Sequence, residues 1–167
     1  PKPGREAVPF GVNPECEPLY TAEQRRRRDS SGWTLVQGIL APLQFAIFLV
    51  SLALVLRFLL TGSGGLAADL SIVAKTLALY TIMVTGALWE KAVFGRYLFA
   101  PAFYWEDVVS MGVIALHSAY LLMLLEGFGS PEQRMLVALA GYAAYVVNAG
   151  QFLLKLRAAR LQTAVAA

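Results

Sequence analysis

Four long apolar segments alternate along the chain with short polar or glycine-rich stretches. The segments cover about residues 33–60, 66–89, 103–125 and 135–156. Each can form a membrane-spanning helix, because ~20 apolar residues cross the ~30 Å hydrocarbon core of a bilayer. Glycine-rich stretches at 62–65 and 127–131 predict tight turns within the first and the last pair of helices. The pattern therefore predicts an all-α fold, an integral membrane four-helix bundle with up-down connections.

The two ends of the chain lack this pattern. Residues 1–22 mix proline, glycine and charge and predict an irregular arm, which a charged lead-in at 23–29 follows. Ser30 or Ser31 is the expected N-cap of the first membrane helix. The first thirty residues contain no apolar run typical of a signal peptide, so we do not expect one there. The expected divisions are an arm with a basic lead-in over 1–31, a four-helix transmembrane domain over 32–158 and a tail over 159–167.

The composition supports a membrane protein. Hydrophobic residues make up 57% of the chain and charged residues only 15%, whereas soluble domains carry about 25% charged residues. The formal net charge is +3, but the basic residues flank apolar segments, which favours contact with anionic lipid over nucleic acid. The single cysteine, Cys16, excludes an intrachain disulfide, and no metal-binding spacing is present.

The distribution of Lys and Arg predicts how the bundle is oriented. All of them except Arg57, Lys75 and Arg134 lie in the N-terminal arm, between the second and third segments, or near the C-terminus. Because positive charge marks the cytoplasmic face of a membrane protein, we expect both termini to be cytoplasmic.

Polar side chains inside apolar segments need a reason, because they are costly in lipid. Asp107, Ser110, Ile114 and His117 follow a 3-4-3 spacing that places them on one helical stripe. Thr76, Tyr80 and Glu90 likewise share a face of the second segment. We expect the two stripes to meet in the interior and to form a polar pocket that opens to the cytoplasmic interface. Other polar residues on the same side are Gln37, Gln44, Thr85, Glu106, Asn148 and Gln151.

Each of these groups also has a structural interpretation. Glu90 and Glu106 lie near the interface, where charge is inexpensive, and the glutamine and asparagine side chains can hydrogen-bond helix to helix. His117 fits a structural imidazole, a proton carrier or an axial metal ligand, although a site held by the protein alone needs more ligands. Lys75 can extend toward the interface or pair with another helix.

Aromatic residues are dense from Trp89 to Trp105. An interfacial aromatic belt is the ordinary explanation. The same segment, which Pro101 interrupts, also offers a surface for a flat hydrophobic ligand.

Several strings resemble one known family, the C3-vinyl hydratases of bacteriochlorophyll biosynthesis. The resemblance covers about residues 20–162 and no catalytic assignment comes with it. The strings are YTAEQRRRRD at 20–29, WTLVQG at 33–38, APLQF at 41–45, WEKAVFGR at 89–96, APAFYWED at 100–107 and YVVNA at 145–149.

The resemblance implies hydration of the C3-vinyl group of chlorophyllide a, or a related bacteriochlorophyllide, to 1-hydroxyethyl. The enzyme would be a hydro-lyase of the inner, intracytoplasmic membrane without a cofactor of its own, because the substrate carries its magnesium. Partners would be the substrate and lipid, with further pigment-biosynthesis enzymes as candidates; the sequence leaves the oligomeric state open.

For this reaction, Glu90 or Glu106 is the expected general acid and Asp107 the base that activates water. His117 would be an axial ligand of the substrate magnesium or a proton relay. Arg96, or the arginines at 25–28, would bind the substrate propionate. Further substrate-binding candidates are Gln37, Gln44, Tyr104, Trp105 and Asn148.

Two other functions compete with this interpretation. A non-catalytic pigment-binding or assembly subunit of a photosynthetic complex would use the same aromatic surface. A small transporter is less well supported, because no internal repeat is visible.

Overall fold

The structure is a computed structural model that describes the backbone of residues 19–165 and the side chains of residues 19–160. Most of the expected N-terminal arm, including Cys16, and the end of the expected tail lie outside the described residues. The described chain is helical, which confirms the all-α class. The helices are α1 (Ala22–Ser30), α2 (Gly32–Thr61), α3 (Gly65–Phe94), α4 (Tyr104–Leu125) and α5 (Pro131–Val165).

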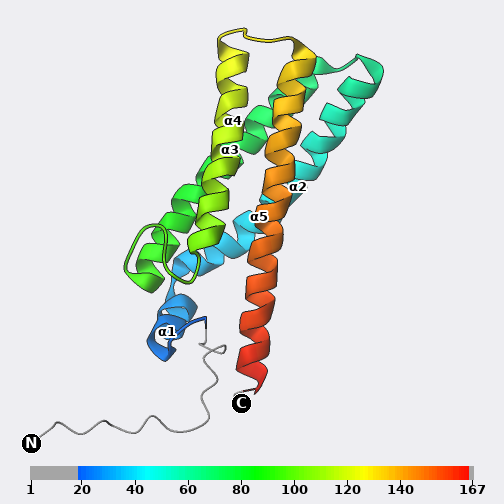
Figure 1. Ribbon diagram of the computed structural model, residues 1–167. Helices are drawn as coiled ribbons and strands as arrows, with labels where there is room; N and C mark the ends of the chain where they lie inside the picture. Colours follow the sequence, from blue (N-terminus) through cyan, green and yellow to red (C-terminus); the bar gives the residue numbers. More distant parts are fainter. Residues whose placement is uncertain (1–18, 166–167) are drawn as a thin grey trace, which may run out of the picture.

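The four long helices form two antiparallel hairpins (Figure 1). The helix pairs α2/α3 and α4/α5 make the most extensive contacts, and α3 with α4 and α2 with α5 join the hairpins into one bundle. The α2–α3 and α4–α5 turns lie at one end of the bundle. Helix α1, the α3–α4 loop and the C-terminal part of α5 lie at the other end, called the α1 end below (Figure 1).

Local signals fix where the helices begin and end. Ser31 caps α2 by accepting a hydrogen bond from the Trp33 N–H, which confirms one of the two expected caps. Thr21 and Gln24 form a reciprocal capping box at α1. At the C-terminal end of α3, Gly95 adopts a φ of 83°, a left-handed conformation that stops the helix.

Helices α3 and α5 extend beyond the expected bounds, and one helix was not expected. Helix α5 runs from Pro131 to Val165, whereas the fourth segment was expected at about 135–156. Helix α3 continues beyond residue 89 to Phe94, because Glu90 and Lys91 are compatible with a helix and the first residue that breaks it is Gly95. The charged lead-in forms the short helix α1, which the sequence analysis did not predict. Its capping box and the ion pair between Glu23 and Arg27, four residues apart, stabilise it.

The outer surface of the bundle is strongly apolar. The four long helices are each long and apolar enough to cross a membrane. Large side chains such as Leu60 and Leu66 are 84% and 74% exposed, an arrangement that suits lipid and would be a liability in water. Four of the described helices could therefore span a membrane, as the sequence predicted.

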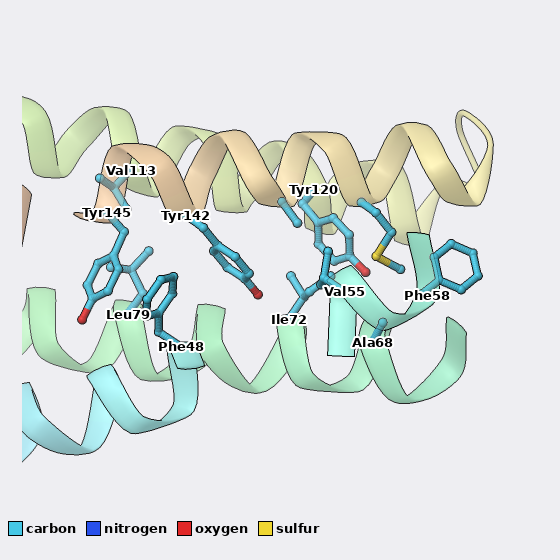
Figure 2. Close-up of a cluster of buried hydrophobic side chains, with 12 residues drawn as sticks. Phe48, Val55, Phe58, Ala68, Ile72, Leu79, Val113, Tyr120, Tyr142 and Tyr145 are labelled. Carbon is cyan, nitrogen blue, oxygen red and sulfur yellow. The ribbon is translucent and has the colours of Figure 1, made fainter. Parts of the chain in front are cut away.

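The core runs through the centre of the bundle between the two hairpins. Phe48 of α2 packs its ring 5.4 Å from Tyr142 and 5.1 Å from Tyr145 of α5, measured between ring centroids. Figure 2 shows both tyrosines pointing from α5 toward the α2–α3 hairpin. This packing holds the hairpins together and fixes which faces of α4 and α5 turn inward.

Candidate functional site

Two carboxyl groups from different helices meet at the α1 end of the bundle. Glu90 lies near the end of α3 and Asp107 in the first turn of α4, and the two are 5% and 3% exposed. Their side chains lie close enough to interact electrostatically. Because two buried carboxylates at close range repel each other, such a pair favours a state in which one carboxyl keeps its proton.

The α3–α4 loop covers this pair and donates hydrogen bonds to both members. The Phe99 N–H donates to Asp107 Oδ2 over 2.7 Å, and the Ala100 N–H donates to Glu90 Oε2 over 3.2 Å. Phe99 has a φ of 58°, which is uncommon for a residue with a large side chain. The strained turn aims two successive backbone N–H groups at the carboxyl pair.

Glu106, next to Asp107 in sequence, has a different partner. It accepts a hydrogen bond from Lys155 Nζ of α5 over 2.6 Å and is itself buried. Lys155 also donates to the Ala102 carbonyl of the α3–α4 loop. The lysine therefore joins α5 to the carboxyl cluster, which consists of Glu90, Glu106 and Asp107. This contact was not predicted, because Lys155 was interpreted only as a signal of membrane orientation. The available signal was its spacing of four residues from Gln151 and seven from Asn148, which places the three on one face of α5.

An open groove of about 400 Å³ begins at this ion pair. Its walls are mainly apolar, apart from Glu106, Lys155 and Gln151. The remaining lining residues are Leu19, Leu154, Ala158 and Ala159. Glu90 and Asp107 of the two predicted stripes come together, but no residue of either stripe lines this groove, so it is not the interior polar pocket expected from the sequence.

An aromatic cluster forms the wall behind the groove. Phe103 lies 5.6 Å from Trp89 and 5.8 Å from Phe152, between ring centroids, and it is almost fully buried. Tyr20 stacks on Phe94 at 5.8 Å. Burial raises the pKa of the Tyr20 phenol, while the positive charge of Arg28 acts in the opposite direction. Of the rings in the dense segment, Trp89, Phe94 and Phe103 thus pack inside the α1 end.

Tyr104 and Trp105 instead face outward. They are 46% and 69% exposed, and their ring centroids are 5.4 Å apart. This position fits the interfacial belt and lies outside the groove, so nothing in the geometry places these rings against the carboxyl pair.

Arg96, the expected partner of a substrate propionate, is exposed on the α3–α4 loop. It makes no ion pair with any residue of the described chain. Two of the arginines at 25–28 are paired within the lead-in, Arg27 with Glu23 and Arg28 with Asp29. The cation nearest to the carboxyl cluster is therefore Lys155.

The amide side chains have separate roles. Gln37 donates to Thr85 Oγ1 over 2.7 Å and joins α2 to α3, the helix-to-helix bond that was one expected alternative. Asn148 donates to Ser110 Oγ over 2.7 Å and joins α5 to α4. Gln44 is buried, and its Oε1 has no hydrogen-bond partner among the described residues.

His117 lies deep in the bundle. The α4 face that carries Asp107, Ser110 and His117 is buried, as the spacing predicted. Ten residues separate His117 from Asp107, which is about 15 Å along a helix. The Nδ1 atom is 2.8 Å from the Val113 carbonyl; because a carbonyl only accepts, Nδ1 carries the proton and Nε2 keeps its lone pair.

Lys75 is the second titratable group at this depth. Its side chain is fully buried, with Nζ 3.6 Å from the centroid of the Tyr145 ring. Within the described part of the chain, no set of three His, Cys, Asp or Glu side chains is arranged to hold a metal ion.

Comparison with known proteins assigns the family. The family model for 2-vinyl bacteriochlorophyllide hydratase matches residues 20–158. The chain belongs to this hydratase family. The match covers all of α1 to α4 and most of α5, so the carboxyl pair, the buried lysine and most of the groove lining lie within the family region.

Two curated relatives agree with the family model and confirm the resemblance found in the sequence. The 2-vinyl bacteriochlorophyllide hydratase of Rhodobacter capsulatus is 67% identical over 153 residues, covering 91% of this chain and 88% of that protein. The protein of the same name from Cereibacter sphaeroides is 68% identical over 143 residues, covering 86% and 89%. No solved structure matches the chain.

Proposed function

We propose that this hydratase family member adds water to the vinyl group of a bacteriochlorophyllide or of chlorophyllide a and forms a 1-hydroxyethyl group. The family name numbers the vinyl position 2, which is C3 in the numbering used above. The observation that carries the mechanism is the pair of neighbouring buried carboxyl groups, Glu90 and Asp107, each of which accepts a backbone hydrogen bond from the α3–α4 loop. Such a pair supplies a proton and a base in one place, the two functions that hydration needs.

The reaction balances with these groups alone. The Glu90 carboxyl donates its proton to the terminal CH₂ carbon, and the π bond breaks to leave positive charge on the carbon next to the macrocycle, where conjugation spreads it. A water oxygen then bonds to that carbon. Asp107 accepts a proton from the water, and transfer of a proton between the paired carboxyl groups restores the starting state.

The arrangement around the pair supports this division of roles. The backbone N–H groups of Phe99 and Ala100 stabilise carboxylate charge as it develops. Glu106 accepts from Lys155, so we assign it to positioning the lysine and not to proton donation. Of the two candidate acids from the sequence, the geometry favours Glu90.

The groove beside Glu106 is the proposed binding place for the edge of the macrocycle. Its apolar walls suit a flat hydrophobic ring, and Lys155 offers an ammonium group to the substrate carboxylate. Because the α3–α4 loop covers Glu90 and Asp107, that loop must shift before the vinyl group reaches them. Arg96 lies on this loop and would move with it. Binding of the substrate propionate by Arg96 therefore stays a prediction.

We further propose an inner-membrane location with both termini in the cytoplasm, because basic residues gather at the α1 end. The magnesium in this scheme belongs to the substrate. His117 is 1% exposed and packed between helices, which disfavours it as an axial ligand to a macrocycle and favours the alternative role in proton transfer.

The test is an anaerobic incubation of the purified protein in detergent with chlorophyllide a, analysed by chromatography and mass spectrometry. The expected product is heavier by one water and has a blue-shifted red absorption band, because the vinyl group leaves the conjugated system. Pigment that binds but stays unchanged would support the non-catalytic pigment-binding function instead.

The carboxyl assignment is tested with amide variants in the same assay. Glu90→Gln and Asp107→Asn should each lower turnover by about 10²–10⁴-fold, the range that acid–base groups contribute. The matched control is Glu126→Gln, an exposed glutamate at the opposite end of α4. If Glu90→Gln and Asp107→Asn both turn over at the control rate, the proposed mechanism is wrong.

A further inference from the structure

Lys75 presents hydrogen-bond donors in the interior of the bundle without an acceptor. Its side chain is fully buried, and Nζ has no hydrogen-bond partner among the described residues. The ammonium group lies over the face of the Tyr145 ring, with Nζ 3.6 Å from the ring centroid. A cation–π contact compensates part of the charge but leaves the three N–H donors unused.

Each of the other three long helices, α2, α4 and α5, carries a buried acceptor that is also unused. These acceptors are Nε2 of His117, Oε1 of Gln44 and Oδ1 of Asn148, all on side chains at least nine-tenths buried and none with a partner among the described residues. Lys75 lies close enough to His117 to act on it electrostatically. This part of the core therefore contains both hydrogen-bond donors and hydrogen-bond acceptors that have no partner among the described residues.

Packing places Gln44 and Asn148 at one level, a single helical turn from Lys75 toward the α1 end. Gln44 precedes Phe48 by four residues, and Asn148 follows Tyr145 by three, while the Phe48 and Tyr145 rings are 5.1 Å apart. Because α2 and α5 are antiparallel, both steps lead in the same direction (Figure 1).

The polar groups continue from this level to the groove. Tyr145, Asn148, Gln151 and Lys155 recur every three or four residues along one face of α5. The Oε1 atom of Gln151 also lacks a partner in the described chain, and Gln151 lines the groove next to Glu106. Asn148 and Lys155 are seven residues apart, which is about 10 Å along the helix.

Only a small ligand fits this column. The helices are packed around fully buried side chains, so a macrocycle cannot enter, whereas a water molecule both donates and accepts and needs two to four polar partners. Unsatisfied polar atoms in the core of a membrane protein each cost about several kcal/mol. Water satisfies the lysine and the acceptors together.

We infer that the side chains of Lys75, His117, Gln44 and Asn148 bind ordered water, and that this column delivers water along α5 to the carboxyl pair. The inference rests on the proposed hydratase function and extends it by naming the route of the second substrate. It also explains why a lysine, and not an apolar residue, occupies this buried position.

The test measures access of water by thiol labelling in the full-length protein, with Cys16→Ser as the background. Asn148→Cys is compared with Val147→Cys, and Gln44→Cys with Leu43→Cys; Val147 and Leu43 face outward from the bundle. The probe is 2-aminoethyl methanethiosulfonate, and intact-protein mass spectrometry follows its addition. Size-exclusion chromatography identifies folded variants.

The column positions should react at least about tenfold faster than their outward-facing neighbours in membrane vesicles, because only ionised thiols in contact with water react. Because the two pairs lie on different helices, the second pair still gives a result if one variant of the first misfolds. Equal, slow labelling of both members in the folded pairs would overturn the inference. Because labelling does not depend on turnover, a dry column in an active enzyme refutes only this inference, and a labelled column in an inactive protein refutes only the hydratase function.

Discussion

Lys75 is an unusual residue at the scale of a single side chain, because its ammonium group lies in the core of a membrane protein without a carboxylate. Tyr145 is the side chain in direct contact with Nζ. Removing an uncompensated buried charge is neutral or stabilising when the replacement has the same shape. A lysine kept for stability alone would therefore be a poor choice at this position, which points to a functional reason.

Replacement of Lys75 by methionine should separate stability from activity. Lys75→Met keeps the length of the side chain and removes the charge, so we expect thermal stability in detergent to stay equal or to rise by about 1–4 kcal/mol. Turnover should fall at least about tenfold, because the water column loses its donor. The pair of measurements is a melting curve and the chlorophyllide assay. Loss of stability with unchanged turnover per folded molecule would assign Lys75 a structural role.

The ion pair of Glu106 and Lys155 gives a second prediction at the residue scale. Lys155→Met leaves the buried Glu106 carboxylate without its partner and should destabilise the protein by about 1–3 kcal/mol, less than a fully buried pair because the lysine is partly exposed. Adding Glu106→Gln should recover part of this loss. A double-mutant cycle on thermal unfolding measures the coupling, and a coupling near zero would show that the pair contributes nothing.

The sequence predicted that the helix faces carrying Glu90 and Asp107 meet, but not which groups bind each carboxyl. Charged residues stand out in apolar segments, so Glu90, Glu106 and Asp107 were identifiable from composition and position alone. Which carboxyl meets which partner depends on the α3–α4 loop, where Phe99 adopts a left-handed conformation. No propensity rule predicts that conformation for phenylalanine, so the two backbone donors of this loop appear only in the structure.

At the scale of helices, the α4–α5 contact depends on a glycine. A Cβ atom built on Gly141 would lie 3.0 Å from Cε1 and Nδ1 of His117, whereas Gly150 on the same helix has nothing within 4 Å. Glycine at 141 thus lets the two helices approach and holds the imidazole in place.

Gly141→Ala should therefore destabilise the protein by about 1–3 kcal/mol through overpacking. The matched change Gly150→Ala should be neutral or stabilise by up to about 1 kcal/mol, because alanine is the better helix former and space is free. Thermal unfolding in detergent compares the two. Equal effects of both substitutions would mean that the close approach of α4 and α5 is not a constraint.

Helix existence was more predictable than helix ends. The apolar segments predicted four long helices because lipid requires a length that few other structures have. The ends depend on short-range chemistry: Gly95 lets α3 run five residues beyond the expected end, and the capping box at Thr21 starts a helix in a segment with no apolar pattern. These signals are present in the sequence, but hydropathy does not detect them.

At the scale of the whole molecule, the α1 end concentrates the features that the reaction uses. The carboxyl pair, the groove, the aromatic wall and most basic residues all lie there, whereas the opposite end consists of short glycine-containing turns. A substrate with a flat apolar ring and a carboxylate is itself amphipathic, so it reaches such a site most directly from the membrane interface. The orientation of the bundle therefore decides from which compartment the substrate arrives.

Topology reporters test this orientation. With the α1 end in the cytoplasm, a fluorescent protein fused after the last residue should fold and fluoresce, and alkaline phosphatase fused at the same place should be inactive. Alkaline phosphatase inserted after Gly127, in the turn between α4 and α5, should be active, because that turn would face the opposite compartment. The basic residues near the α1 end provide the physical reason, since positively charged flanks are retained in the cytoplasm. The reverse reporter pattern would place the carboxyl pair and its groove on the outer side and would exclude delivery of substrate from cytoplasmic enzymes.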